Sequence, residues 1–204
     1  MNTWMKISRQ FGKPSGILGG VAGFIMSHRS SNIQRNKWGI SLLNLRPNDN
    51  VLEIGFGPGI AIKMMSEKID TGSIYGIDHS ELMLRNATDR NIEAINSGKV
   101  KLFLGSVGEL PKFDRPIDKI LDINSFQFWQ NLGEQLISLK NKMALNGTIA
   151  LVHQPRKPGS TSEDSELSAN NFADILKSAG FKNIRTEKLM LKPVPAICVL
   201  GYNC

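Results

Sequence analysis

The chain has 204 residues, of which 41% are hydrophobic, and it carries only two cysteines, Cys198 and Cys204. This length and composition are enough to fill one sizeable core, and no proline- or serine-rich linker divides the chain. Two cysteines close together near one end indicate neither a disulfide framework nor a metal site, so we expect no metal and a reducing, cytoplasmic location.

The net charge of +7 is concentrated at one end of the chain. Residues 1–48 hold seven of the 25 Lys and Arg residues and none of the 18 Asp and Glu residues. Such a segment attracts phosphate, an anionic membrane surface or an anionic small substrate, although solvated helix faces have the same composition. The apolar stretch at 16–26 is too short and too rich in glycine to cross a bilayer. We therefore expect a basic, glycine-rich arm or lid at 1–30 and one domain at 31–204.

The expected elements alternate along the chain. Helical spacing at 31–47, ending before Pro47, predicts a helix that covers the site as an N-terminal lid. Short apolar runs predict strands at 50–54, 73–78, 100–105, 117–124 and 147–154, separated by helices at about 59–69, 80–96, 131–144 and 167–179. After Gly180 two apolar runs follow with no helix between them, which indicates an antiparallel pair at the sheet edge. The predicted fold is α/β: a Rossmann-like doubly wound sheet, mostly parallel, with an antiparallel C-terminal strand.

The stretch "VLEIGFGPG" at 51–59 carries the strongest motif. An acid at Glu53 inside an apolar strand is costly without a partner, and Gly55, Gly57 and Gly59 follow at every second position. Dinucleotide-binding turns have G-x-G-x-x-G, but Ile60 stands where that third glycine belongs. The pattern acid-x-G-x-G-x-G resembles motif I of the class I S-adenosylmethionine-dependent methyltransferases.

The resemblance extends over roughly residues 35–180 and implies S-adenosylmethionine as the cofactor. It implies that Glu53 lies near the methionine ammonium group and that Asp78, in "GIDHSELMLRNA", accepts from the ribose hydroxyls. Serine replaces the usual aspartate of the third signature, at Gly105-Ser106-Val107. The residues implied to contact the cofactor are Glu53, Gly55, Gly57, Gly59, Asp78, His79, Ser106, Val107 and Asn124.

The region implied to face the methyl acceptor lacks the motifs of several methyltransferase groups. Residues 124–127 are Asn-Ser-Phe-Gln, without the two prolines that shape a base pocket in enzymes methylating nucleic-acid amines. An aromatic loop suits an apolar or planar acceptor, although simple core packing at the start of the next helix is the favoured alternative for Phe128 and Trp129. The residues proposed to face the acceptor are Trp38, Phe126, Gln154 and Arg156, and His153 is a weak candidate for a general base.

We therefore predict a methyltransferase that acts on a small-molecule or lipid-like acceptor, with peripheral membrane contact through the basic arm as an open possibility. Small enzymes related to ubiquinone, menaquinone and phospholipid methyltransferases have this general shape. Three alternatives remain: a nucleic-acid methyltransferase recruited by the arm, a non-catalytic binding protein with the same fold, and an NAD-dependent oxidoreductase. The glycine spacing does not fit G-x-G-x-x-G, and position 53 is an acid; both features argue against the NAD-dependent oxidoreductase.

Overall fold

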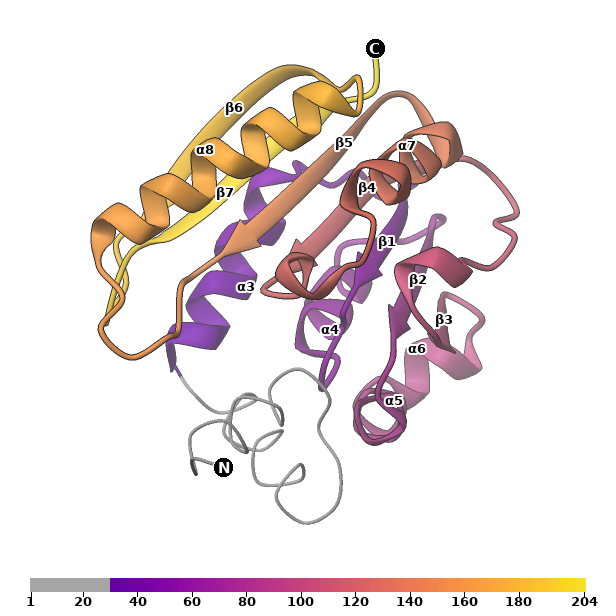
Figure 1. The fold of residues 1–204 in the computed structure, drawn as a ribbon. Helices are drawn as coiled ribbons and strands as arrows, with labels where there is room; N and C mark the ends of the chain where they lie inside the picture. Colours follow the sequence, from indigo (N-terminus) through magenta and orange to yellow (C-terminus); the bar gives the residue numbers. More distant parts are fainter. Residues whose placement is uncertain (1–29) are drawn as a thin grey trace.

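A computed structural model describes residues 30–204, and Figure 1 shows their arrangement. The strands are β1 (Asn50–Ile54), β2 (Ser73–Asp78), β3 (Val100–Leu104), β4 (Ile117–Ile123), β5 (Met143–His153), β6 (Lys182–Leu189) and β7 (Ala196–Tyr202). The α-helices are α3 (Ser30–Leu42), α4 (Ile60–Ser66), α5 (Glu81–Arg90), α6 (Ile92–Asn96), α7 (Leu132–Lys142) and α8 (Ser162–Ser178). Short 3₁₀ helices span Val107–Glu109 and Phe126–Phe128.

The strands form one sheet of seven in the order β3-β2-β1-β4-β5-β7-β6. The pairs from β3 through β5 are parallel, whereas β7 runs antiparallel to both of its neighbours. The chain moves outward from β1 to β3 and then returns to β4, so the order reverses between β1 and β4. The predicted mostly parallel sheet with an antiparallel C-terminal strand is confirmed, and ligands of such sheets bind where the order reverses.

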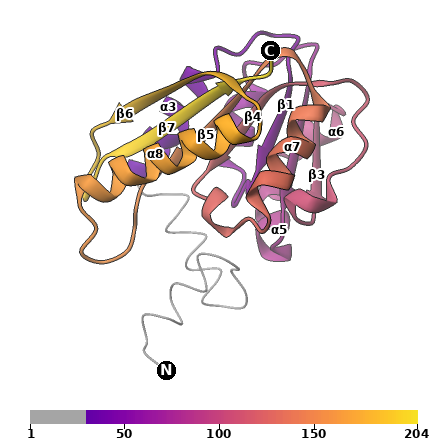
Figure 2. The same ribbon diagram turned by 45° about the horizontal axis from the view of Figure 1, so that its top comes forward.

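Helices cover both faces of the sheet, and each face has its own apolar core. Helices α7 and α8 pack on one face, where Leu136, Leu139 and Phe172 join a cluster with residues of the strands. On the other face α3, α4 and α5 contribute Ile40, Ile62 and other side chains to a second cluster. Figure 2 shows α7 and α8 together in front of the sheet, with α3 behind it.

Several element boundaries differ from those predicted, for local reasons. The helix expected over 80–96 divides into α5 and α6 at Asn91, whose side-chain amide donates to the Ala87 carbonyl at 2.8 Å and the Gly59 carbonyl at 3.1 Å. Helix α8 begins well before the predicted position 167, because Thr161 and Asp164 form a reciprocal N-terminal cap. Helix α3 ends at Leu42, and Asn44 then adopts a left-handed φ of 49°.

Two predictions concern residues that the structure does not describe. The glycine-rich arm, as a lid or as a membrane contact, lies almost wholly in residues 1–29, outside the described part of the chain. Within residues 30–204, none of the helices combines the length and the apolar character that crossing a bilayer requires.

Candidate active site

The three glycines after β1 form the turn that leads into α4, and each has a positive φ. A Cβ on Gly55 would lie 2.3 Å from the Ser125 Cβ, and one on Gly59 would lie 2.7 Å from the Ala87 Cβ. Among residues 30–204, a Cβ on Gly57 would meet nothing within 4 Å. Packing against protein therefore requires glycine at 55 and 59, whereas the backbone at 57 faces open space, where a ligand can approach it.

Glu53 lies on β1, just before this turn, with one side-chain oxygen that has no hydrogen-bond partner among the described residues. This oxygen is Oε2, and the residue is 2% exposed. Burial raises its pKa well above the ordinary value, and the carboxylates of Asp122 and Asp78 raise the pKa further. A buried acid beside two others is costly to ionise, so this position fits a ligand that brings a positive charge.

Asp78, at the end of β2, connects this strand to the glycine turn. Its Oδ2 accepts from the Gly57 backbone N–H at 2.8 Å, and its Oδ1 accepts from the Ser80 backbone N–H at 2.9 Å. Burial is the largest influence on its pKa, which is raised, although both N–H donors act in the opposite direction. His79 is exposed, with its Nδ1 4.0 Å from the Asp78 carboxylate. The two residues thus stand together beside the open backbone of Gly57.

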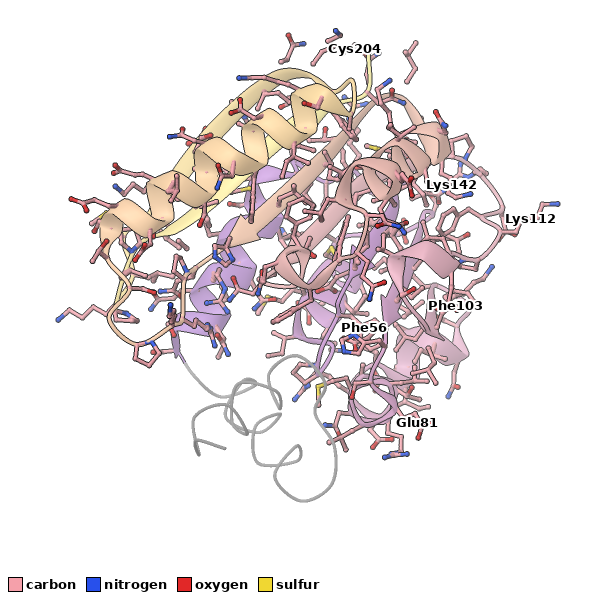
Figure 3. The ribbon with its side chains drawn as sticks, viewed as in Figure 1. Phe56, Glu81, Phe103, Lys112, Lys142 and Cys204 are labelled. Atoms are coloured by element: carbon pink, nitrogen blue, oxygen red, sulfur yellow. The ribbon has the colours of Figure 1, made fainter. Side chains whose placement is uncertain are left out.

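The third predicted signature lies after β3. The Ser106 hydroxyl donates to Glu109 Oε2 at 3.0 Å and caps the Glu109 backbone N–H, which leaves its oxygen one lone pair to accept a further hydrogen bond. Val107 is buried in the core beneath this turn. In Figure 3 the labelled Phe56, between the first two glycines, and Glu81, which opens α5, lie toward one end of the sheet, and Lys142, just before β5, lies toward the other. The glycine turn and the acid of β2 therefore share one end of the sheet.

Asp122 completes the group of acids, and the sequence analysis did not single it out. It is 1% exposed near the end of β4, and the backbone N–H groups of Ser125 and Phe126 donate to its Oδ1 at 3.2 and 3.0 Å. Burial raises its pKa to about 7 despite these donors. An acid within the apolar run "KILDI" is the same signal that identified Glu53, so the sequence contained the information needed to find it.

Asn124 and Gln154 join the ends of β4 and β5. Asn124 has a left-handed φ of 59°, and its Oδ1 accepts from the Gln154 backbone N–H at 2.8 Å. The Gln154 side chain is 2% exposed and donates to the Val194 carbonyl at 2.8 Å, while its Oε1 accepts from Arg35 at 2.6 Å. Gln154 therefore holds neighbouring segments together, which corrects the expectation that it faces the acceptor.

The Phe126 side chain also packs in the protein interior. It is 1% exposed, and its ring makes edge contacts with Trp129 and Phe172 at centroid distances of 5.0 and 4.6 Å. Packing on both sides leaves no free face for an acceptor, so the prediction for Phe126 is corrected in the same way. Phe128, two residues further, is 52% exposed and supplies the accessible aromatic surface of this loop.

The remaining candidates surround the end of β5. Trp38, on α3, is half-buried against the second core cluster. Arg156 is half-buried and donates to the Asn32 Oδ1, and the same oxygen accepts from Arg35 at 2.6 Å. The His153 Nδ1 is buried without a hydrogen-bond partner among the described residues. Burial, followed by the charges of Arg35 and Arg156, lowers the pKa of His153 to about 4.

His153 also lines a pocket of about 320 Å³ between the end of β5 and the first turns of α8. The pocket wall includes Leu167, Asn171 and Ser168 of α8 and the loop from Pro155 to Ser160. A neutral imidazole with such a low pKa is a weak base at neutral pH, because an effective general base has a pKa near the working pH. The structure therefore weakens the case for His153 as a general base.

We expect Asp122→Asn to stabilise the folded protein at high pH. The pKa of Asp122 is about 7 in the folded protein, against an ordinary value of 3.8. The contribution of Asp122 to the free energy of unfolding is therefore fully present below about pH 4 and is lost as the pH rises through 7. At pH 8 the loss is on the order of 2–4 kcal/mol. An asparagine keeps the acceptor for the Ser125 and Phe126 N–H groups and lacks the charge.

Thermal unfolding at pH 5 and pH 8 tests this expectation. Asp122→Asn should raise Tm clearly at pH 8 and much less at pH 5. The exposed Asp174, which pairs with Lys177 on the surface of α8, provides the control, and Asp174→Asn should change stability by less than about 0.5 kcal/mol at either pH. A variant at 122 that is less stable than wild type at pH 8 would contradict the assignment of a buried, costly charge.

An acid on β1, a glycine turn, an acid ending β2 and a doubly wound sheet with an antiparallel β7 together define the class I methyltransferase fold. Residues 51–141 match the family described as the methyltransferase domain. The chain therefore contains a segment that matches a methyltransferase domain, and its fold is that of solved S-adenosylmethionine-dependent methyltransferases.

Individual proteins resemble the chain over most of its length. It is 28% identical over 178 residues to YdaC, an uncharacterized methyltransferase of Bacillus subtilis, covering 87% of this chain and 95% of the relative. A S-adenosylmethionine-dependent methyltransferase from Aquifex aeolicus superposes with a TM-score of 0.68 at 19% identity over 100% of both chains. A Haloferax volcanii structure of a complex with the Trm112 methyltransferase activator gives a TM-score of 0.72 at 13% identity, over 89% of this chain and 92% of that chain. At these identities the two structural similarities show the fold.

Proposed function

We propose that the protein transfers a methyl group from S-adenosylmethionine to a small-molecule or lipid-like acceptor. The observation that carries the cofactor half of this proposal is the combination of an unsatisfied buried oxygen on Glu53 with open space at the Gly57 backbone. A cofactor with a cationic amino-acid end and a flat nucleoside fits both features. When bound, it supplies a sulfonium methyl group that is electrophilic enough for direct in-line transfer.

In this proposal the protein binds the cofactor and the acceptor, orients them and excludes water from the site. Glu53 pairs with the ammonium group, and Asp78 accepts from the ribose hydroxyls in place of its present hydrogen bond to the Gly57 N–H. Ser106 and Val107 border the adenine, with His79 at its outer edge. Asn124 stands at the end of β4, between the cofactor and the acceptor. Rate acceleration then comes mainly from alignment of the acceptor lone pair and from exclusion of water.

The acceptor half of the proposal depends on the loop after β4. Asp122, Ser125 and Phe126 tie this loop into the core, and no proline in it shapes a base pocket. The exposed ring of Phe128 offers an apolar surface, and Trp38 lies on the neighbouring α3. We retain residues 1–30 as a basic lid or membrane contact and 31–204 as the catalytic domain. The cytoplasmic location remains part of the proposal, since the only cysteines, Cys198 and Cys204, are free thiols.

A release assay tests the proposal on the full chain. The protein is incubated with S-adenosylmethionine and with separate pools of lipids, quinone precursors, amines and RNA, and S-adenosylhomocysteine is measured. We expect release with a lipid or small-molecule pool. Release with RNA alone would replace the proposal with the nucleic-acid alternative, and cofactor binding without release from any pool would favour a non-catalytic binding protein.

A further inference from the structure

The pocket of about 320 Å³ between β5 and α8 is large enough for a small molecule. The loop that joins the two elements, from Pro155 to Ser160, forms one part of its wall, and the first turns of α8 form another. Figure 1 shows this loop leaving the end of β5 and turning back into α8. The pocket therefore opens at the end of the sheet where the strand order places ligands.

His153, the last residue of β5, contributes an imidazole ring to the wall of this pocket. Its Nδ1 is enclosed by protein and has no hydrogen-bond partner among residues 30–204. Its Nε2 also has no hydrogen bond in this part of the chain, yet it is not one of the enclosed unpartnered atoms. The ring packs against Phe172 at a centroid distance of 5.6 Å. Nε2 is therefore the nitrogen that a ligand in the pocket can reach.

The surroundings of the two nitrogens indicate where the proton of the ring lies. Burial is the largest of the causes that lower the pKa of His153 to about 4, so at neutral pH the ring is uncharged and carries one N–H. A buried N–H without an acceptor is rarer in proteins than a buried acceptor without a donor. The proton accordingly belongs on Nε2 and the lone pair on Nδ1. The pocket then contains a neutral N–H donor.

The rest of the wall favours an uncharged ligand with an apolar body. Its charged members are one cation, Lys157, and one anion, Asp164, whose charges offset each other. Pro155, Pro158 and Leu167 supply apolar surface, and Leu167 is 60% exposed. Small-molecule sites combine apolar walls with a few polar groups that fix the orientation of the ligand. The wall of this pocket has that composition.

The pocket also lies on the acceptor side of the site. Gln154, the residue after His153, donates its backbone N–H to Asn124 Oδ1 at the end of β4. Asp78, implied to hold the ribose, ends β2, which is separated from β5 by β1 and β4. A molecule in the pocket is therefore close to the ends of β4 and β5 and distant from the nucleoside.

We propose that this pocket binds an uncharged methyl acceptor through a carbonyl oxygen, which accepts a hydrogen bond from His153 Nε2–H. The inference rests on the proposed function, and it narrows the acceptor to a neutral carbonyl compound with an apolar body. His153 then determines specificity and orients the acceptor, and it removes no proton from it. A site that donates a hydrogen bond discriminates against an analogue without the acceptor atom, because the donor is left unpaired.

Acetophenone and α-methylstyrene are the probes for the full chain, because they have nearly the same shape and differ in the carbonyl oxygen. Benzoate tests for an anionic ligand. Nitrogen NMR of the wild type shows which ring nitrogen of His153 carries the proton, and the methyl signals of Leu167 follow titration in every variant. His153→Leu removes the donor. His153→Gln is the rescue variant, since its side-chain amide places an N–H near the position of Nε2.

Two further variants test whether the probes occupy this pocket. Asn170 and Asn171 are adjacent exposed residues of α8, and of the two only Asn171 lines the pocket. Asn171→Trp should fill the space and weaken binding of both probes at least tenfold, whereas Asn170→Trp should leave both affinities unchanged. Thermal unfolding verifies that all variants are folded. Equal effects of the two tryptophans would contradict the location.

We expect the proton on Nε2 and acetophenone binding at least fivefold tighter than α-methylstyrene. His153→Leu should abolish this preference, and His153→Gln should retain it. A proton on Nδ1, equal affinities for the two probes, or tighter binding of benzoate than of acetophenone would overturn the inference.

Calorimetry with S-adenosylhomocysteine distinguishes failure of this inference from failure of the proposed function. Wild-type protein that binds S-adenosylhomocysteine but does not prefer acetophenone would refute the assignment of the pocket and leave the proposed function standing. Wild-type protein that prefers acetophenone but does not bind S-adenosylhomocysteine would refute the proposed function and leave a pocket for carbonyl compounds.

Discussion

Gly57→Val should weaken binding of S-adenosylhomocysteine at least 100-fold while the domain stays folded. No atom of the described residues lies within 4 Å of a Cβ placed on Gly57, so a valine side chain would occupy the volume assigned to the ligand. The φ of 52° adds strain, since a β-branched residue rarely adopts a left-handed conformation. Calorimetric titration of wild type and variant measures the change in affinity.

The chain provides a matched control for the backbone strain. Gly98 has a φ of 79°, and its Cβ would likewise meet nothing within 4 Å in the described part of the chain, but it lies in the turn between α6 and β3. Gly98→Val and Gly57→Val should each lower stability by about 1–3 kcal/mol, a typical cost of such backbone conformations. Only the change at 57 should affect affinity. Unchanged affinity in Gly57→Val, or equal losses in both variants, would refute the assignment of this turn to the cofactor.

The glycine turn shows how much of the site the sequence could predict. The spacing of the three glycines and the acid before them identified the turn, because local backbone requirements leave a local signature. The sequence did not distinguish the reasons for each glycine. Gly55 and Gly59 are required by contacts with Ser125, in the loop after β4, and with Ala87, on α5. Those reasons depend on tertiary packing and became visible only in the structure.

The acceptor side was predicted less well for the same physical reason. Gln154 and Phe126 follow strand ends, where functional residues concentrate, yet both are buried and serve the packing of their neighbours. Arg35 was considered only as one of seven cations in the basic segment. Its role depends on how α3 packs against the end of β5, and its hydrogen bond to Gln154 spans 119 positions of sequence. Composition located the charge, and the fold determined where each of the described cations lies.

Glu53→Gln should weaken S-adenosylmethionine binding by about 10- to 100-fold, which corresponds to losing a hydrogen bond between charged groups worth about 1.5–3 kcal/mol. Glutamine has nearly the same shape as glutamate and lacks its charge, so it cannot neutralise the ammonium group of the cofactor. 5′-Methylthioadenosine, which has the nucleoside of the cofactor but lacks its amino-acid part, is the control ligand. Its affinity should be the same for wild type and variant, because its contacts involve Asp78 and Ser106 rather than Glu53.

The same pair of proteins should differ in the pH dependence of binding. Burial and the neighbouring Asp122 and Asp78 hold the Glu53 pKa well above its ordinary value, so part of the population is protonated in mildly acidic solution. Pairing with the ammonium group requires the ionised form, and affinity should therefore rise with pH from 5 to 8 as protons are released on binding. In Glu53→Gln the rise should be reduced at least by half, the remainder coming from Asp122. Calorimetry in buffers of different ionisation enthalpy counts the protons released on binding. If affinity changes with pH by the same amount in wild type and variant, Glu53 does not bind the ammonium group.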